Sequence, residues 1–244
     1  VDSLKNSKTK LPGYLAIGGI AAVSTLAGMT EVNAAQVGNG ATHDELTATE
    51  FTFNTANKDL TVRSDNSGNP KISTIGVGAI TDNATQGDLI ITSQAADVTG
   101  LIVTVASVIM NAGTTVGANA ITDVDNAEGD MTVTFSGAYL HDGALIISTT
   151  EDEDSETLTV NFDGATTFTV ASIIDAGATG VTGIINTKFS AAAIFIAGLD
   201  LKDSANSAGT STATFDGAGT QAIGGTLDGQ ADNMGNIAVT NTAG

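Results

Sequence analysis

The sequence predicts an all-β fold, an irregular, β-helix-like β-solenoid that follows an N-terminal signal-peptide helix. Three observations support this fold class. Short stretches alternate between apolar and polar residues, similar stretches recur at unequal intervals, and the apolar residues are mostly Ala, Val, Ile and Leu. Aromatic residues make up only 4% of the chain and Trp is absent, so a core must be built largely from small and β-branched side chains, which suit stacked strands. One or more β-sandwiches are the alternative fold.

Residues 1–34 have the order of a secretory signal peptide. Three lysines lie within the first ten residues, an uncharged and mostly apolar stretch runs from Tyr14 to Met29, and small residues that suit a cleavage site end at Ala34. The apolar stretch is shorter than the roughly 20 residues that a membrane-spanning helix needs. We therefore expect cleavage after Ala34, with a retained apolar helix as the alternative, and a linker over residues 35–50.

A strand-repeat domain is expected over residues 51–244. Its predicted strands have five to seven residues, are rich in Val, Ile, Thr and Phe, and are separated by Gly, Asn, Asp and Ser, which is typical of strands and turns. They are FTFNT (51–55), DLTVRS (59–64), DLIITS (88–93), LIVTVAS (101–107), DMTVTF (130–135), ALIIST (144–149), TLTVNF (157–162) and TTFTVAS (166–172). The stretch FSAAAIFIAGLDL (189–201) fits either a short helix or a buried strand.

Internal similarity is visible, but its spacing varies. The similar pairs start at Ile80 and Ile121, at Thr104 and Thr169, and at Gly87 and Gly143, and each pair has a different offset. These offsets share no common unit, so a repeat of one fixed length is not expected. A solenoid whose coils differ in loop length fits the pattern better.

The segment 157–170 allows two geometries. A three-residue hairpin loop, Asp163 to Ala165, would pair Val160 with Phe168 and Leu158 with Val170, so that all apolar side chains share one face. A solenoid corner at Asp163-Gly164 is the alternative. Either geometry buries the first strand on one side only.

The charge distribution excludes two classes of partner. The net charge is −19, and the stretch between Lys71 and Lys188 holds fifteen Asp and Glu but no Lys or Arg. Proteins bind the phosphate backbone through Lys and Arg, so nucleic acid is not an expected partner, and an anionic membrane surface would repel this chain. The chain has no Cys, which excludes disulfides, thiol catalysis and cysteine-based metal sites.

The strands GDLIIT, TLTVNF and TVAS, together with the signal peptide and a composition rich in Ala, Thr, Gly, Asn and Asp, resemble the β-strand-repeat passenger regions of bacterial autotransporter-type surface proteins, of the rickettsial outer-membrane protein B kind. The resemblance implies an exported, non-catalytic protein at the cell surface, the outer membrane or outside the cell, acting as a surface coat or an adhesin. Its partners would be a host or neighbouring-cell surface, or further copies of itself. The closing residues IAVTNTAG do not resemble a translocator barrel, so we expect a fragment of a longer chain.

A weak calcium site is the one metal site that the sequence indicates. DVDNAEGD offers four acids that could supply oxygen ligands around a Gly turn, Asp123, Asp125, Glu128 and Asp130. The stretch departs from the EF-hand loop, because Gly stands at its seventh position and no Glu stands at the twelfth. A solvated strand connector is the alternative. The consecutive acids of EDEDSE (151–156) point in opposite directions in an extended chain, so we expect a charged connector there.

No catalytic residue and no other cofactor is expected. Neither H-E-x-x-H nor G-x-S-x-G occurs, His141 lies in a predicted turn, and the chain has one Arg, two Tyr and no Trp to hold a sugar. Two alternatives to a coat or adhesin remain open. One is a secreted, polysaccharide-acting enzyme on a β-solenoid, and the other is a filament subunit anchored by its N-terminal helix.

Overall fold

The computed structural model describes residues 41–43, 49–53, 59–63, 74–82, 86–93, 100–111, 117–124, 129–150, 156–176, 181–203, 209–228 and 233–240. Within these ranges every regular element is a β-strand and no helix occurs, so none of the described residues forms a helix that could cross a bilayer. The signal-peptide segment 1–34 lies outside the described residues. Of the expected linker 35–50, residues 41–43 form a strand and a second strand begins at Thr49.

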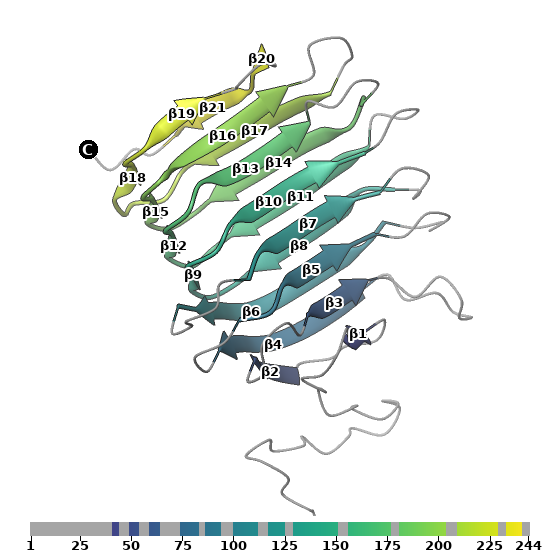
Figure 1. The fold of residues 1–244 in the computed structure, drawn as a ribbon. Helices are drawn as coiled ribbons and strands as arrows, with labels where there is room; N and C mark the ends of the chain where they lie inside the picture. The colour runs from purple at the N-terminus through teal and green to yellow at the C-terminus, as the bar shows by residue number, and fades with distance from the viewer. Residues whose placement is uncertain are drawn as a thin grey trace, which may run out of the picture. The chain divides into compact units, whose positions relative to one another are not determined.

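The strands form two sheets, in which all pairs but one are parallel (Figure 1). Sheet A contains nine strands. They are β1 (Ala41–His43), β3 (Leu60–Arg63), β5 (Leu89–Thr92), β7 (Asn119–Asp123), β10 (Leu145–Thr149), β13 (Ser172–Ala176), β16 (Gly198–Asp203) and β19 (Thr226–Asp228), with β20 (Asn233–Met234) antiparallel beside β16.

Sheet B contains twelve strands in two branches. The long branch is β2 (Thr49–Phe53), β4 (Thr74–Asp82), β6 (Ile102–Met110), β8 (Met131–Phe135), β11 (Thr157–Phe162), β14 (Ile184–Phe189), β17 (Thr210–Phe215) and β21 (Asn236–Val239). The short branch is β9 (Tyr139–His141), β12 (Thr166–Phe168), β15 (Ala193–Phe195) and β18 (Gln221–Ile223). The branches join at β6, which pairs with both β8 and β9.

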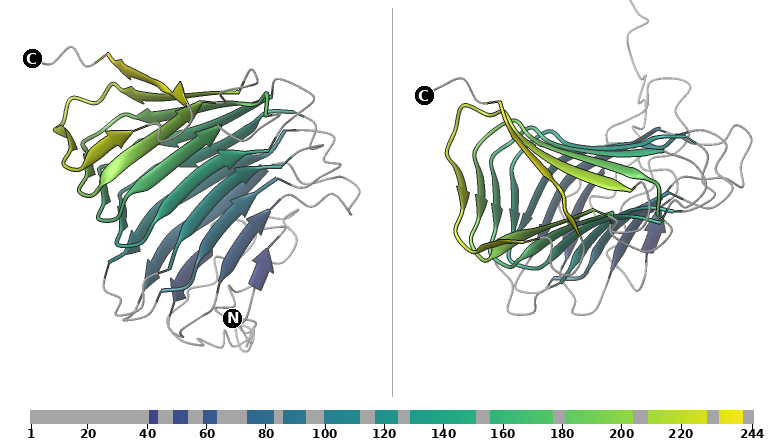
Figure 2. Two further views of the ribbon diagram at one scale, coloured as in Figure 1. Left: turned by 45° about the horizontal axis from the view of Figure 1, so that its top comes forward. Right: turned by 90° about the horizontal axis from the view of Figure 1, so that it is seen from above.

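The chain is a β-solenoid of about five turns, which confirms the predicted fold class. A coil of the later part runs through the long branch, the short branch and sheet A in turn, as β11, β12 and β13 do. Figure 2 shows these coils stacked one behind another, with sheet A and the long branch facing each other and the short branch closing one side. All eight predicted strand segments overlap an observed strand, and 189–201 holds strands rather than a helix.

The central coils share one repeat length. Met131, Leu158 and Ile185 lie one above another in the long branch, and the step in sequence from the first to the second equals the step from the second to the third. Tyr139, Thr166 and Ala193 are stacked with the same step in the short branch. The spacing is less regular in the earlier coils, where Leu89 pairs with Asn119 and Asn119 with Leu145. The solenoid is therefore irregular as predicted, but the expectation that no fixed unit exists is wrong for its centre.

The hairpin geometry for residues 157–170 is wrong, and the solenoid corner is correct. β11 pairs with β8 and β14, and β12 pairs with β9 and β15, so the two strands belong to parallel ladders and not to each other. Leu158 and Phe168 face the core, whereas Val170 is 41% exposed. The chain turns again between Phe168 and Ser172 because each coil must return to sheet A.

Most of the few aromatic side chains are concentrated in the core, where they form ladders along the stack. Phe135, Phe162, Phe189 and Phe215 stack in sequence with ring centroids 5.0, 5.1 and 5.0 Å apart. A second ladder stacks Phe168 on Phe195 at 4.7 Å. The in-register pairing of each coil with the next places identical side chains above one another, so a scarce residue type fills one continuous column.

We expect Phe162→Ala to lower the free energy of unfolding by about 3–5 kcal/mol, because it leaves a cavity between two stacked neighbours. Urea denaturation followed by circular dichroism measures the change. Val170→Ala is the matched control, since its side chain is exposed, and it should change stability by less than about 0.5 kcal/mol. A loss for Phe162→Ala no larger than that of the control would contradict the ladder.

Candidate functional site

Of the four predicted calcium ligands two are described, and they bond to different groups. Asp123 ends β7 and is fully buried, and its Oδ1 accepts a hydrogen bond from Ser93 Oγ at 2.8 Å. Asp130 is exposed before β8, and its Oδ1 accepts a hydrogen bond from the Thr157 backbone N–H at 3.0 Å. Asp125 and Glu128 lie outside the described residues. Within the described ranges no three His, Asp or Glu side chains gather as metal ligands would, and calcium binding stays a prediction.

The described acids beside the strands connect neighbouring coils. Of EDEDSE only Glu156 is described, and its Oε1 accepts a hydrogen bond from Gly129 N–H of the preceding coil. Asp88 is bonded on both sides, because its Oδ1 accepts from Ala118 N–H at 2.7 Å while its own N–H donates to Asp59 Oδ1 at 3.0 Å. These carboxylates satisfy backbone donors where a strand begins. From the sequence alone, such acids indicate only ligands or solvated charges.

A group of polar side chains lies inside the solenoid, and we call it the core polar cluster: Gln86, Asn119, Tyr139 and His141. All four are at most 1% exposed. Asn119 Nδ2 donates to the Tyr139 hydroxyl at 2.7 Å, and Gln86 Nε2 donates to the Met110 carbonyl at 2.8 Å. Burial raises the pKa of Tyr139 far above its usual range, more than its Asn119 hydrogen bond lowers it. The phenol stays neutral and acts as a structural group.

His141 is not the turn histidine that the sequence suggests. It ends β9, and its ring meets the Tyr139 ring edge-on with centroids 6.1 Å apart. Burial lowers the pKa of His141 to about 4, and a polar contact with the Gly117 backbone opposes that shift only in part. The imidazole is therefore neutral at pH 7. The turn comes after it, at Gly143, where an added Cβ would overlap the Gly117 carbonyl.

The most regular exposed feature lies on the outer side of the long branch. Two rows of side chains cross the coils there, and we call them together the hydroxyl–amide face. The first row is Ile102, Thr132, Thr159, Asn186, Thr212 and Asn236, and the second is Thr104, Thr134, Asn161, Lys188, Thr214 and Ala238. None of these residues is buried, and successive members of each row are register partners. The face is thus a two-row lattice set by the backbone.

The hydroxyl–amide face is almost free of charge. Its one ionisable residue is Lys188, whose Nζ lies 2.7 Å from Asp216 Oδ2. The hydrogen bond and the charge of Asp216 raise the pKa of Lys188, so the pair is neutral as a whole. The acids described near this face lie beside the strand ends, for example Glu156 before β11 and Asp163 after it. A neutral band is therefore bordered by negative charge.

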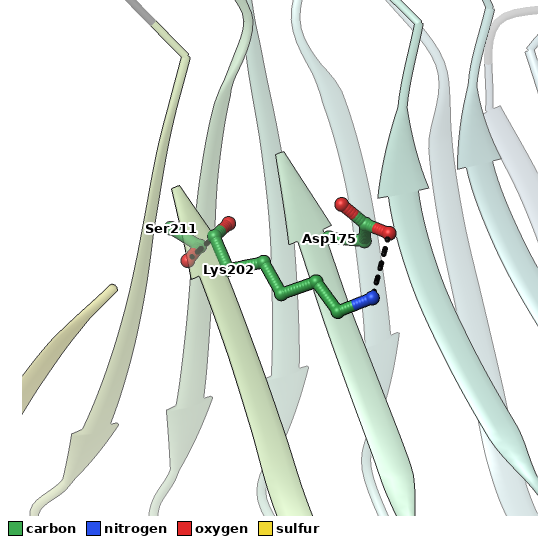
Figure 3. Close-up of polar contacts among 3 residues, drawn as sticks. All are labelled: Asp175, Lys202 and Ser211. Carbon is green, nitrogen blue, oxygen red and sulfur yellow. Dashed lines mark hydrogen bonds and ion pairs between the residues drawn. The ribbon is translucent and has the colours of Figure 1, made fainter. Parts of the chain in front are cut away.

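The outer side of sheet A differs from the hydroxyl–amide face in the residues of its rows. There a row of Ile90, Ala120, Ile146 and Ile173 lies beside a polar row that ends in Asp175 and Lys202. Figure 3 shows Lys202 extended toward Asp175, with its Nζ 3.5 Å from Oδ2, and Ser211 Oγ donating to the Lys202 carbonyl at 2.9 Å. Within the polar row, the Thr122 and Ser148 hydroxyls lie 3.2 Å apart and bond to each other. The described part of sheet A offers no comparable neutral lattice.

The hydroxyl–amide face is not among the sequence predictions, although its signal is present. Thr at alternate positions appears in MTVTF, TLTVNF and TSTATF, and the first two lie one coil apart in register. From the sequence alone, the pattern indicates only strand alternation. Recognising a face needs the coil length, which places Thr above Thr.

Comparison of the chain with protein-family models, with curated proteins and with solved structures finds no match. The resemblance to autotransporter passengers therefore stays an expectation, and the geometry of the chain itself is the basis for a functional proposal.

The acids beside the strands are expected to act as hydrogen-bond acceptors more than as charges. Asp88→Ala should lower the free energy of unfolding by about 1–3 kcal/mol, since the backbone N–H of Ala118 loses its partner. Asp88→Asn keeps an acceptor oxygen and should lose less than half as much. Urea denaturation compares the two, and equal losses would show that the negative charge is what matters.

The buried imidazole makes stability depend on pH. The pKa of His141 is about 4 in the folded chain and about 6.5 when unfolded, so the unfolded chain binds more protons between these values and stability falls on acidification. Between pH 7.5 and pH 5 the free energy of unfolding should fall by on the order of 2 kcal/mol.

His141→Gln should remove most of this pH dependence in urea denaturation at a series of pH values. His43→Gln, which replaces the other histidine of the sequence, is the control. If the His43 variant loses the pH dependence and the His141 variant keeps it, the assignment is wrong.

Proposed function

We propose that this chain is an exported, surface-displayed protein of structural or adhesive type, with no catalytic role. The observation that carries the proposal is the hydroxyl–amide face, a regular, neutral and outward-facing lattice on a strongly acidic chain. A flat array of short side chains suits contact with an extended surface more than capture of a small molecule, since small-molecule sites are concave and largely apolar. The signal-peptide pattern of residues 1–34 supports export.

The construction of the solenoid also supports a role in contact. Repeat proteins provide long binding surfaces because each coil rests only on its neighbours and adds one further row to the surface. The acids bordering the face keep the net charge far from zero, which helps the chain to stay soluble and to avoid unspecific pairing of its sheets. The hydroxyl–amide face could therefore serve as the contact surface for adhesion.

The proposal predicts that fluorescently labelled protein binds to cell surfaces saturably through the hydroxyl–amide face. Thr159→Tyr, which places a bulky ring in the middle of the lattice, should weaken binding by about tenfold, the size of a hot-spot loss. Thr122→Tyr is the matched control, because it changes an outward-facing Thr of β7 on sheet A. Equal binding by both variants, or no saturable binding by the unchanged chain to any cell tested, would count against an adhesive role of this face.

A further inference from the structure

We propose that the hydroxyl–amide face binds ice. The inference rests on the proposed function, in that it takes this face as the contact surface, and it goes further by naming crystalline water as the partner. Three properties of the face carry it: a two-dimensional repeat, six Thr among its twelve residues, each a stiff side chain with both a methyl and a hydroxyl group, and the near absence of charge.

The repeat of the face is set by the backbone in both directions. Neighbouring parallel strands lie about 4.8 Å apart, and alternate residues of one strand are separated by about 6.6 Å. Thr132 and Thr134 in β8 are the register partners of Thr159 and Asn161 in β11, so the same spacing recurs from coil to coil. The spacing across the coils is close to the distance between second-neighbour oxygen atoms in ice. Side-chain oxygens on this grid can therefore order water in an ice-like layer.

The side chains that form the grid are held still. Thr is β-branched and has a restricted χ1 angle, and on β8, β11 and β17 each Thr of the face alternates with a buried core residue. Below the grid lies the Phe135, Phe162, Phe189 and Phe215 ladder. Side-chain hydrogen bonding within the described face is sparse, with Asn161 Nδ2 donating to Thr134 Oγ1 at 3.4 Å. The hydroxyls therefore remain available to water without losing their position.

Charge matching favours ice over other extended surfaces. A charged partner would be selected by opposite charges, but the only ionisable residue of the face, Lys188, is neutralised by Asp216. Neutral polysaccharides are commonly held by aromatic platforms, and the two rows of the face contain no aromatic residue. Crystalline water is a neutral, regular partner that Thr methyl groups and hydroxyls can contact together.

Sheet A provides an internal comparison. It has the same strand spacing, but one of its outer rows is Ile90, Ala120, Ile146 and Ile173, and in the polar row beside it the Thr122 and Ser148 hydroxyls bond to each other. A row of Ile and Ala presents no hydroxyl groups, and hydroxyls that bond to each other are less available to water. The inference is therefore specific to the outer side of the long branch.

The test measures ice binding by the purified full chain. Thermal hysteresis and partition of the protein into a slowly grown ice crystal are both expected for the unchanged chain. Thr159→Tyr should reduce the partition by about tenfold, and Thr122→Tyr on sheet A should leave it unchanged. Thr159→Val keeps the shape and the methyl groups of Thr and serves as a second, mild variant in case the larger ring disturbs folding. Circular dichroism and the urea midpoint show that each variant is folded.

The outcomes separate the inference from the proposed function. Exclusion of the unchanged chain from ice, or an equal loss of ice partition in the Thr159 and Thr122 variants, overturns ice binding. If the chain is excluded from ice but binds cells, or an insoluble neutral polysaccharide, in a Thr159-dependent way, then ice binding is wrong while adhesion through the face stands. Loss of both activities in the Thr159→Tyr variant alone supports both proposals.

Discussion

Backbone hydrogen bonds between successive coils hold each strand in parallel register with the strand before it and the strand after it. A shift by one residue would move every core side chain to the outside, so this register is also what keeps the core apolar. Because the register is the same over the central coils, like side chains stack on like. The phenylalanine ladder inside and the hydroxyl–amide face outside both result from this register, on opposite faces of the same strands.

The same constraint explains the role of the acids. Where a strand begins, the ladder stops and backbone N–H groups lose their regular partners. Asp88, Asp130 and Glu156 supply those partners from a neighbouring coil. Asp130 is exposed and Asp88 and Glu156 are half-buried, so these acids lie at the edge of the core and not inside it. These three acids therefore act in separate contacts between coils.

The core carries polar groups as well as apolar ones. Asn119 donates to Tyr139 and Gln86 donates to the backbone of Met110, while His141 lies neutral beside them. Buried polar groups cost stability unless they are hydrogen-bonded, so the cluster restricts how the corner can pack. The two outer faces also differ: the long branch presents two rows made mostly of Thr and Asn, whereas sheet A presents a row of Ile and Ala beside a polar row.

Alternation of apolar and polar residues was sufficient to predict strands buried on one side, because alternation depends on residue type alone. The corner at Asp163-Gly164, the burial of His141 and the neutral face could not be decided in this way. They depend on which residues lie one coil apart. The number of residues in a coil varies with the length of its corners, and the sequence pattern does not give that length. Only the folded coil, with its constant length at the centre, places Thr159 above Thr132 and so turns a strand pattern into a surface.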